Sequence, residues 1–348
     1  MVNVVEIKEM LKGKDYDFLR NDANLGNNIM FLTLGGSKAY GTDVETSDTD
    51  IRGCTMMQKS MLLGLPSYSK NNFEQYVETE TDTVIYAFNK LVELLLSCNP
   101  NTIEMLGCKP EHYIYKNEAG DMLISNKSLF LSQRAVTAFG GYATAQLRRL
   151  TNALARDAYT QSEKEKHIYN SCMNILNTFD DRHAEMKEGS INLYVDKSQK
   201  EEMDTEIFTD ITLKHYPLRD MQGIFSELFN VIRDYQKIGK RNHKKDDEHL
   251  NKHAMHLIRL YLMGIDILEK GEIKTYREEN LDLLMSIRRG DFRTSDGLFN
   301  SAFFDMITEY EKRLNYAAEN TCLPKQPDYK RVNELVMTIN EMAIKKSM

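Results

Sequence analysis

Hydrophobic and polar positions are distributed in two different ways along the chain. In the first third, short apolar runs are bounded by turn-forming residues, which is typical of buried β-strands. This pattern predicts three strands, over residues 27–34 (NNIMFLTL), 46–54 and 77–88. A helix is expected over residues 89–97, where Asn99-Pro100 ends it.

A further helix is expected from about Ile103, with Asn101 or Thr102 as its cap. Together these elements predict a mixed α/β domain that ends near residue 125. From about residue 127 onward, helical periodicity dominates instead. It is clearest over residues 129–154, 250–270, 303–318 and 329–345, and harder to phase over 221–238.

Residues 190–215 interrupt the helical pattern because they are richer in β-formers, which predicts a small sheet or hairpin. The expected fold class is therefore α+β: an amino-terminal mixed sheet with helices, followed by a mostly α-helical domain. We expect the first domain over residues 1–125 and the second over 126–348, with an insertion at about 185–250.

Composition narrows the class of protein. The 348 residues are 41% hydrophobic and 28% charged, as in ordinary globular proteins. Five cysteines without a CxxC pair favour reduced thiols over a disulfide framework or zinc site, and hence a cytoplasmic protein. The amino terminus lacks a secretory signal pattern, and the strongest apolar run, residues 91–98, is too short to span a bilayer, so no membrane partner is expected.

The formal net charge of −7 argues against a general nucleic-acid coat, although a local basic groove is compatible with it. The most basic segment is residues 237–245 (KIGKRNHKK), which could bind RNA phosphates or form a solvated loop.

The most informative stretch is LGGSKAYGTDVETSDTDIRG, residues 34–53. Gly36 and Ser37 offer backbone N–H groups with little steric hindrance, which suits a triphosphate. Lys38 lies in the same turn and could contact phosphate, and Gly41 lets the segment turn back.

Asp48 and Asp50 follow that turn, and in a strand they would point to the same face. Two carboxylates on one face repel each other unless cations lie between them. A pair of Mg²⁺ (or Mn²⁺) ions about 4 Å apart would meet that need and stabilise an in-line displacement. Taken alone, the Gly-Ser segment could be a plain turn, and the Asp-x-Asp segment could be the solvated start of a strand. Both segments together, between two apolar strands, favour catalysis.

GGSKAYGT followed by SDTDIRG resembles the signature of the DNA polymerase β nucleotidyltransferase superfamily. The stretch from Asp82 to Leu106 is similar to a bacterial and phage subfamily that includes RNA-ligase-associated polymerase-β-like proteins. The similarity resumes at residues 142–150, 252–273 and 323–336, and it is missing at about 155–250.

The resemblance implies a third carboxylate on a neighbouring strand. Asp82 is the expected residue because only Thr83 separates it from the apolar VIYAF run. Glu78 and Glu80 would share its face by alternation and stay open as alternatives. An exposed structural role for Asp82 is also open.

A basic stripe is expected on the helix over residues 250–270. Lys252, His256 and Arg259 recur at i, i+4 and i+7 on one face, and they could reach the triphosphate or an RNA backbone. An ordinary solvated face is the alternative. Arg148 and Arg149, on a second helix, could approach the nucleotide or pair with surface carboxylates.

The resemblance implies a metal-dependent transfer of a nucleoside monophosphate from an NTP to an acceptor hydroxyl, with RNA as the favoured acceptor. Asp48, Asp50 and Asp82 would hold two metal ions, and Gly36, Ser37, Lys38, Gly41 and the basic stripe would bind the nucleotide. Two alternatives remain: nucleotidylation of a protein or small molecule, and a non-catalytic, antitoxin-like binding module. The sequence predicts no oligomeric state.

Overall fold

The computed structural model describes residues 4–65, 73–158, 188–197, 205–214 and 247–346, with a few single positions between 166 and 229. The chain forms two compact units. The first comprises Met1–Gln146, Asn251–Phe292 and Ser301–Met348, and the second comprises Leu147–Leu250 and Arg293–Asn300. These units group residues by contact and not by function, so the expected division at residue 125 stays a prediction.

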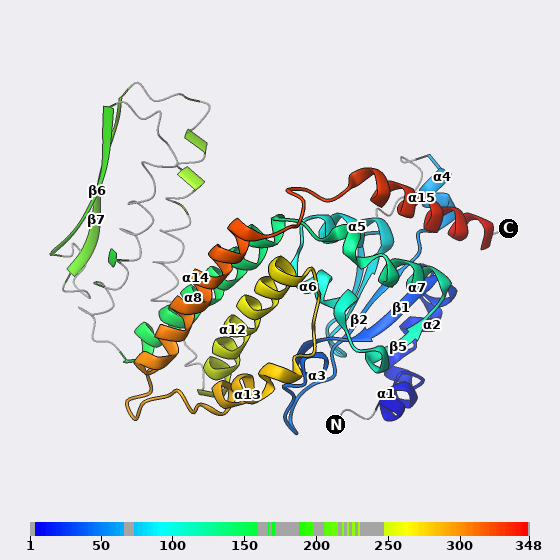
Figure 1. The fold of residues 1–348 in the computed structure, drawn as a ribbon, viewed down its shortest axis with the longest axis horizontal. Helices are drawn as coiled ribbons and strands as arrows, with labels where there is room; N and C mark the ends of the chain where they lie inside the picture. Colours follow the sequence, from blue (N-terminus) through cyan, green and yellow to red (C-terminus); the bar gives the residue numbers. More distant parts are fainter. Residues whose placement is uncertain are drawn as a thin grey trace. The chain divides into compact units, whose positions relative to one another are not determined.

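A five-stranded mixed sheet forms the centre of the first unit (Figure 1). Its strand order is β3-β4-β2-β1-β5, and only β2 and β4 of the paired strands run parallel. The strands are β1 (Ile29–Leu34), β2 (Ile51–Thr55), β3 (Gln75–Glu78), β4 (Thr83–Ala87) and β5 (Tyr113–Lys116). The fold is thus α+β, as predicted.

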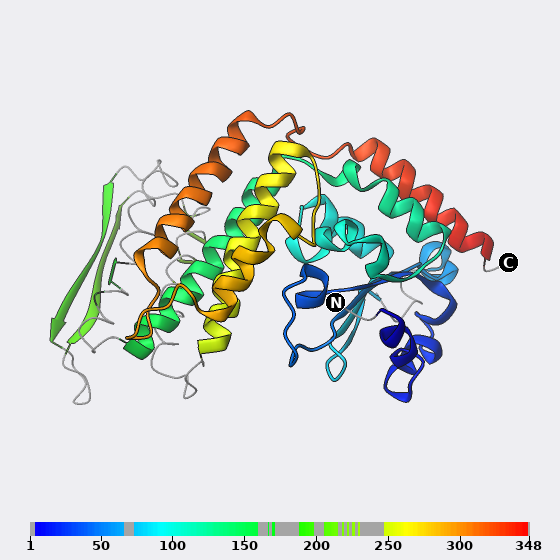
Figure 2. The same ribbon diagram turned by 60° about the horizontal axis from the view of Figure 1, so that its bottom comes forward.

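Helices cover both faces of this sheet because the central strands are buried on both sides. α5 (Phe88–Leu96) and α7 (Glu118–Ser125) contact one face, and α15 (Tyr329–Lys346) packs on α7 (Figures 1 and 2). On the other face, α1 (Val4–Met10) and α2 (Phe18–Asn21) bury apolar side chains against the sheet. Apolar side chains are therefore buried on both faces of the sheet.

Two predicted strands have different bounds in the structure. The strand expected over residues 46–54 begins only at Ile51, so Asp48 and Asp50 lie in the loop before it. The strand expected over 77–88 is instead a hairpin, β3 and β4, whose turn contains Glu80 and ends at Asp82. Both differences arise because Thr, Asp and Glu alternate equally well in extended loops and in strands.

The helix after Asn99-Pro100 also begins earlier than expected. Asn99 caps α6 (Pro100–Ile103) by accepting a hydrogen bond from the Asn101 N–H, so neither Asn101 nor Thr102 is the cap. Proline at the first helical position needs no hydrogen bond from its own nitrogen, which explains the earlier start.

Long helices complete the first unit, and three of them meet closely. Gly264 of α12 (Asp247–Lys270) faces Phe139 of α8 (Arg134–Ala158) and Leu314 of α14 (Ser301–Asn320), and a Cβ there would lie 3.0–3.1 Å from both side chains. Glycine thus permits the close approach of these helices. The shorter helices are α3 (Gly36–Tyr40), α4 (Lys59–Leu63) and α13 (Leu281–Arg289).

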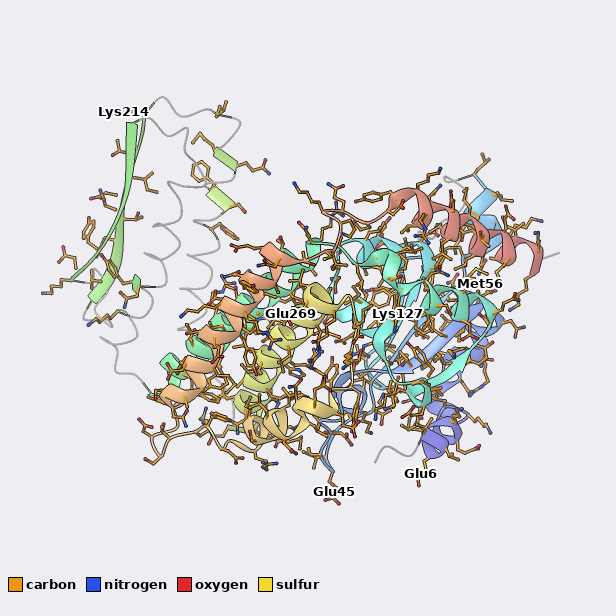
Figure 3. The ribbon with its side chains drawn as sticks, viewed as in Figure 1. Glu6, Glu45, Met56, Lys127, Lys214 and Glu269 are labelled. Carbon is orange, nitrogen blue, oxygen red and sulfur yellow. The ribbon has the colours of Figure 1, made fainter. Side chains whose placement is uncertain are left out.

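Short 3-10 helices join the other elements: η1 (Lys14–Tyr16), η2 (Gly26–Asn28), η3 (Glu104–Gly107), η4 (Pro110–His112), η5 (Lys127–Phe130) and η7 (Glu278–Asn280). The loop that joins α3 to β2 has Glu45 at its exposed tip (Figure 3). This loop also carries Asp48 and Asp50.

The second unit contains an antiparallel β-hairpin, which confirms the β prediction for residues 190–215. It consists of β6 (Glu188–Lys197) and β7 (Thr205–Lys214), and Lys214 marks its end in Figure 3. Most of residues 221–238 and all of 237–245 lie outside the described part of the chain. Among the described helices, none combines the length and apolar character needed to cross a bilayer.

Candidate active site

The Gly-Ser turn places the start of α3 directly against Asp50. Gly36 has a positive φ of +54°, and a Cβ at this position would lie 1.9 Å from the Asp50 Oδ2. The neighbouring Gly35 N–H donates to the Asp50 backbone oxygen at 2.9 Å. Any side chain at Gly36 would displace the carboxylate, so the turn and the aspartate form one structural element.

Asp50 and Asp82 lie side by side because each immediately precedes a strand of the parallel pair. Ile51 is aligned with Thr83, and the Ile51 N–H donates to the Asp82 backbone oxygen at 3.2 Å. The two carboxyl groups share a hydrogen bond. Asp82 has a φ of +44°, an uncommon conformation for a non-glycine residue.

Arg52 bridges the two carboxylates. Its Nη2 lies 3.0 Å from Asp50 Oδ1 and 3.2 Å from Asp82 Oδ1. Its Nη1 donates to the Asp82 backbone oxygen at 2.5 Å. The guanidinium therefore fixes the β2 and β4 ends of the site to each other.

The two carboxyl groups have pKa values shifted in opposite directions. Burial, followed by the hydrogen bond to Asp82, raises the pKa of Asp50 to about 6, although Arg52 opposes the shift. Burial also raises the pKa of Asp82, but the hydrogen bond from Asp50 and the charge of Arg52 outweigh it and leave that pKa lowered. Asp50 is thus the group that holds a shared proton, and above pH 6 the pair carries two adjacent negative charges.

These two carboxylates suit a divalent cation in their chemistry. They are the oxygen ligands that Mg²⁺ prefers, and a cation would relieve the repulsion that the shared proton relieves at lower pH. Asp48 is exposed two residues earlier. Among the described residues, no three His, Cys, Asp or Glu side chains are grouped closely enough to hold a metal ion. The structure thus brings Asp50 and Asp82 together, without Asp48.

The other two candidates for the third carboxylate lie elsewhere in the hairpin. Glu78 ends β3 opposite Thr83, and Glu80 is exposed in the turn, where its N–H donates to Glu78 Oε1 at 3.4 Å. Asp82 is the residue whose carboxyl group shares a hydrogen bond with Asp50. The geometry therefore favours Asp82.

Contacts from α3 and α13 hold the loop that carries the aspartates. Lys38 of α3 donates to the Thr49 hydroxyl. Arg288 of α13 donates from Nη1 to the Thr42 carbonyl oxygen at 2.6 Å, and from Nη2 to the Ser47 Oγ at 3.4 Å. Arg288 thus joins α13 to the loop that follows α3. In this structure Lys38 therefore contacts the loop that carries the aspartates.

Gly41 ends α3 in the left-handed conformation, with a φ of +77°. A Cβ there would lie 2.3 Å from the Tyr276 ring. Gly41 therefore makes the turn predicted from the sequence, and it also allows the aromatic ring to pack on the backbone. Ser37, one turn earlier, is buried with 5% of its surface exposed.

A buried polar cluster connects α3 to α12. Arg259 Nη1 lies 2.8 Å from Glu104 Oε2, and Glu104 Oε1 accepts a hydrogen bond from the Tyr40 hydroxyl at 2.8 Å. The Arg259 guanidinium also lies over the Tyr40 ring, 3.7 Å from its centroid. Arg259 is thus enclosed and paired with a carboxylate, although the sequence predicted a nucleotide contact.

The other two residues of the basic stripe differ in exposure. Lys252 is exposed, and its positive charge lowers the pKa values of both Asp50 and Asp82. His256 has its ring edge-on to Tyr40 at 5.9 Å. Burial, followed by the charges of Arg259 and Lys252, holds the His256 pKa well below its usual value, so this histidine is neutral at pH 7. Lys252 is therefore the cation of the stripe that acts on the carboxylate pair.

Arg148 and Arg149 are exposed on the part of α8 that belongs to the second unit.

Comparison with known families gives a match over the region of the chain that contains this site. Residues 11–171 match the model of the family described as RlaP, RNA repair pathway DNA polymerase beta family. Over this span the chain is similar to that family. No curated protein and no solved structure matches the chain.

The match to the RNA repair polymerase β family confirms the resemblance seen in the Gly-Ser and Asp-x-Asp motifs. The matched span contains the five-stranded sheet, the Gly36 turn, Asp50 and Asp82. It ends before α12, so the similarity expected at residues 252–273 and 323–336 stays a prediction.

Sequence reasoning missed two charged residues of this region. Arg52 stands in the SDTDIRG motif, and its position two residues after Asp50 is a signal that could have identified it. Glu104 gave no comparable signal, because its partner Arg259 is 155 positions away in the sequence.

Proposed function

We propose that this protein, which is similar to the RNA repair polymerase β family, is a metal-dependent nucleotidyltransferase. It transfers a nucleoside monophosphate from an NTP to an acceptor hydroxyl, an RNA end, and releases pyrophosphate. The observation that carries this proposal is the paired carboxyl groups of Asp50 and Asp82, held against the Gly36 turn. Neighbouring carboxylates next to a glycine turn fit chemistry on a polyphosphate.

Asp48 and Asp50 would hold two Mg²⁺ or Mn²⁺ ions, and Asp82, the third carboxylate, would bind the ion that activates the acceptor hydroxyl. The metal ions would neutralise the charge that develops on the transferred phosphoryl group. The lowered pKa of Asp82 makes this carboxylate a better ligand than a base, because a weakly basic group removes a proton poorly near neutral pH.

The triphosphate would lie between the Gly-Ser turn and α12. Backbone N–H groups of Gly36 and Ser37 supply donors, and the conformation of Gly41 sets the direction of the following loop. Lys252 is exposed and acts electrostatically on the carboxylate pair, which makes it the main candidate for a phosphate contact from α12.

The remaining predicted nucleotide contacts instead hold α3 and the loop that follows it: His256, Arg259 and Lys38. Arg259 holds Tyr40 of α3 through Glu104, and His256 packs on the same ring. Lys38 would reach phosphate only after leaving the Thr49 hydroxyl. Positioning of the nucleotide and neutralisation of charge would then supply most of the rate enhancement.

The proposal is tested by incubation of the protein with each labelled NTP and Mg²⁺, in parallel with RNA, protein and small-molecule acceptors. Label should pass to RNA, pyrophosphate should be released, and Asp50→Ala should abolish both. Transfer to protein alone would identify a different acceptor for the same chemistry. Absence of transfer to any acceptor, or equal transfer by Asp50→Ala, would contradict the enzymatic proposal and favour a binding module.

A further inference from the structure

Arg52 occupies the position between the two carboxylates that a metal ion would need. Its Nη2 contacts the Oδ1 atoms of both Asp50 and Asp82, at 3.0 and 3.2 Å. Those oxygens are also the proposed metal ligands, so guanidinium and metal cannot both use them fully. Competition between the two cations follows from this geometry.

The Arg52 side chain is held in place along its length. Arg52 is the second residue of β2, and Asp50 lies two positions earlier, in the loop that precedes this strand. The Arg52 Cγ packs at the Gly35 backbone, where a Cβ would lie only 2.8 Å away. Only the guanidinium end is free to change partners, and 22% of the side chain is exposed to solvent.

The charges favour such an exchange. The pair carries two negative charges once both groups are ionised, and one arginine balances one of them. A divalent cation balances both, and the guanidinium cannot leave by losing its proton because it stays charged in proteins. A displaced arginine next to a polyphosphate has a fork geometry that matches phosphate oxygens.

We propose that Arg52 is an exchangeable counter-ion: it pairs with Asp50 and Asp82 in the metal-free protein, is displaced by the divalent cation, and then binds a phosphate oxygen of the NTP. The proposal rests on the proposed nucleotidyltransfer function. It gives Arg52 two opposite effects, because the residue weakens metal binding and strengthens nucleotide binding. A purely structural arginine would not produce this reversal of sign.

Two calorimetric titrations test the proposal on the full chain at pH 7.5. Mn²⁺ is titrated first without nucleotide, and a non-hydrolysable NTP analogue is then titrated at saturating Mn²⁺. Arg52→Gln should bind Mn²⁺ about fivefold more tightly than the wild type, and the analogue about fivefold or more weakly, as expected for loss of a partly exposed charged contact. The affinities of Arg52→Lys, which keeps the charge, should lie between those of the wild type and Arg52→Gln in both titrations.

Arg313→Gln is the matched control, because it also removes one positive charge and breaks an ion pair, with Glu269, which does not involve Asp50 or Asp82. Circular dichroism confirms that each variant is folded, and Arg52→Lys carries the test if Arg52→Gln is not. Equal Mn²⁺ affinity in the wild type and the Arg52 variants would overturn the inference and leave the proposed function intact. No Mn²⁺ binding by any variant would overturn both.

Discussion

Asp50 is destabilised in its ionised form by the environment that suits it to bind a cation. Burial and Asp82 raise its pKa to about 6, above the ordinary value of 3.8. An acid with a raised pKa in the folded state binds its proton more tightly there than in the unfolded state. Its contribution to stability is therefore complete below about pH 4 and is lost as the pH rises through 6.

Asp50→Asn should consequently gain stability relative to the wild type as the pH rises. We expect the unfolding free energy of the variant to exceed that of the wild type by on the order of 1–2 kcal/mol at pH 8, and the difference to shrink towards pH 4. Urea denaturation without divalent metal at both pH values measures it. Glu45→Gln, at the exposed loop tip, is the control, and an Asp50→Asn variant that is less stable than wild type at pH 8 would contradict the account.

The sequence identified individual site residues where the chemistry is local. Gly36, Asp50 and Asp82 stand next to apolar strands in a recognisable order, and the structure brings them together. The burial of Arg259 and its pairing with Glu104 could not be predicted. Helical periodicity places this residue on one face of its helix but does not show what covers that face. Asp48 shares the motif with Asp50, but the loop that carries it is shaped by Arg288 from a distant helix.

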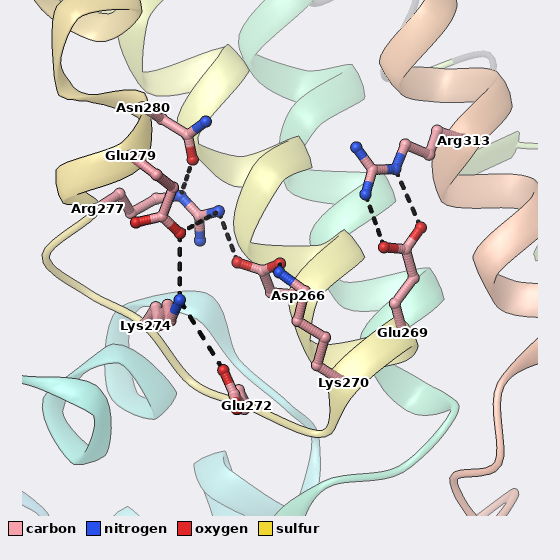
Figure 4. A network of polar contacts seen from close by, with 9 residues as sticks. All are labelled: Asp266, Glu269, Lys270, Glu272, Lys274, Arg277, Glu279, Asn280 and Arg313. Carbon is pink, nitrogen blue, oxygen red and sulfur yellow. Dashed lines mark hydrogen bonds and ion pairs between the residues drawn. The ribbon is translucent and has the colours of Figure 1, made fainter.

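At the scale of elements, α12 is held to the chain that follows it by a buried ion pair (Figure 4). Asp266 Oδ2 lies 2.6 Å from Arg277 Nη2, and both side chains are at most 4% exposed. Lys270 contacts the other oxygen of Asp266 at 2.7 Å. Burial raises the pKa of Asp266, but Lys270 and Arg277 together outweigh it and leave that pKa lowered.

Asp266→Asn should destabilise the protein strongly, because it leaves the buried Arg277 charge with only the half-exposed Glu279 carboxylate, 4.0 Å away. The expected cost is about 3–5 kcal/mol at pH 7. Since the folded-state pKa is lowered, this stabilisation is present above the unfolded pKa near 3.8 and disappears as the pH falls through the lower folded value. Urea denaturation curves of wild type and variant should therefore converge in acid.

The matched control is Glu269→Gln, three residues along the same helix. Glu269 pairs with Arg313 at 2.7 Å, but Arg313 is 49% exposed, so the loss should be at most about 1 kcal/mol (Figure 4). Equal losses for Asp266→Asn and Glu269→Gln would show that burial of the Arg277 pair does not matter.

Elements were predicted best where one periodicity holds over a long stretch, as in α12, α14 and α15. The hairpin at β6 and β7 was also found, because its β-formers contrast with the helices around it. The starts of β2 and α6 were misplaced, since alternating polar residues and short caps satisfy several local structures. Strand order and the parallel pairing of β2 with β4 depend on distant contacts and had no local signal.

For the whole molecule, the first unit is assembled from three separate stretches of chain. The family match ends at residue 171, before α15, which packs on α7, and before α12, which packs on α8 at Gly264. The buried face of α15 includes Val332, Leu335, Ile339 and Ala343. Glu104 depends on Arg259 of α12 for its ion pair.

A fragment of residues 1–171 should therefore fail to fold cooperatively. It lacks α12 and α15, exposes the apolar surfaces that they cover, and leaves Glu104 buried without its cation. Thermal unfolding followed by circular dichroism, with the full chain as reference, measures the effect. A sharp transition in the fragment near that of the full chain would show that the matched span is an independent domain, as a boundary near residue 125 would allow.

The most direct test of the central claim compares two carboxylates of one hairpin. Transfer of label from the NTP identified as substrate is measured for the wild type, Asp82→Asn and Glu78→Gln under identical conditions. We predict that Asp82→Asn lowers the rate at least about a hundredfold, as loss of a charge-stabilising group does, while Glu78→Gln stays near the wild-type rate. A wild-type rate for Asp82→Asn, or equal losses in both variants, would contradict the assignment of Asp50 and Asp82 as the centre of nucleotidyl transfer.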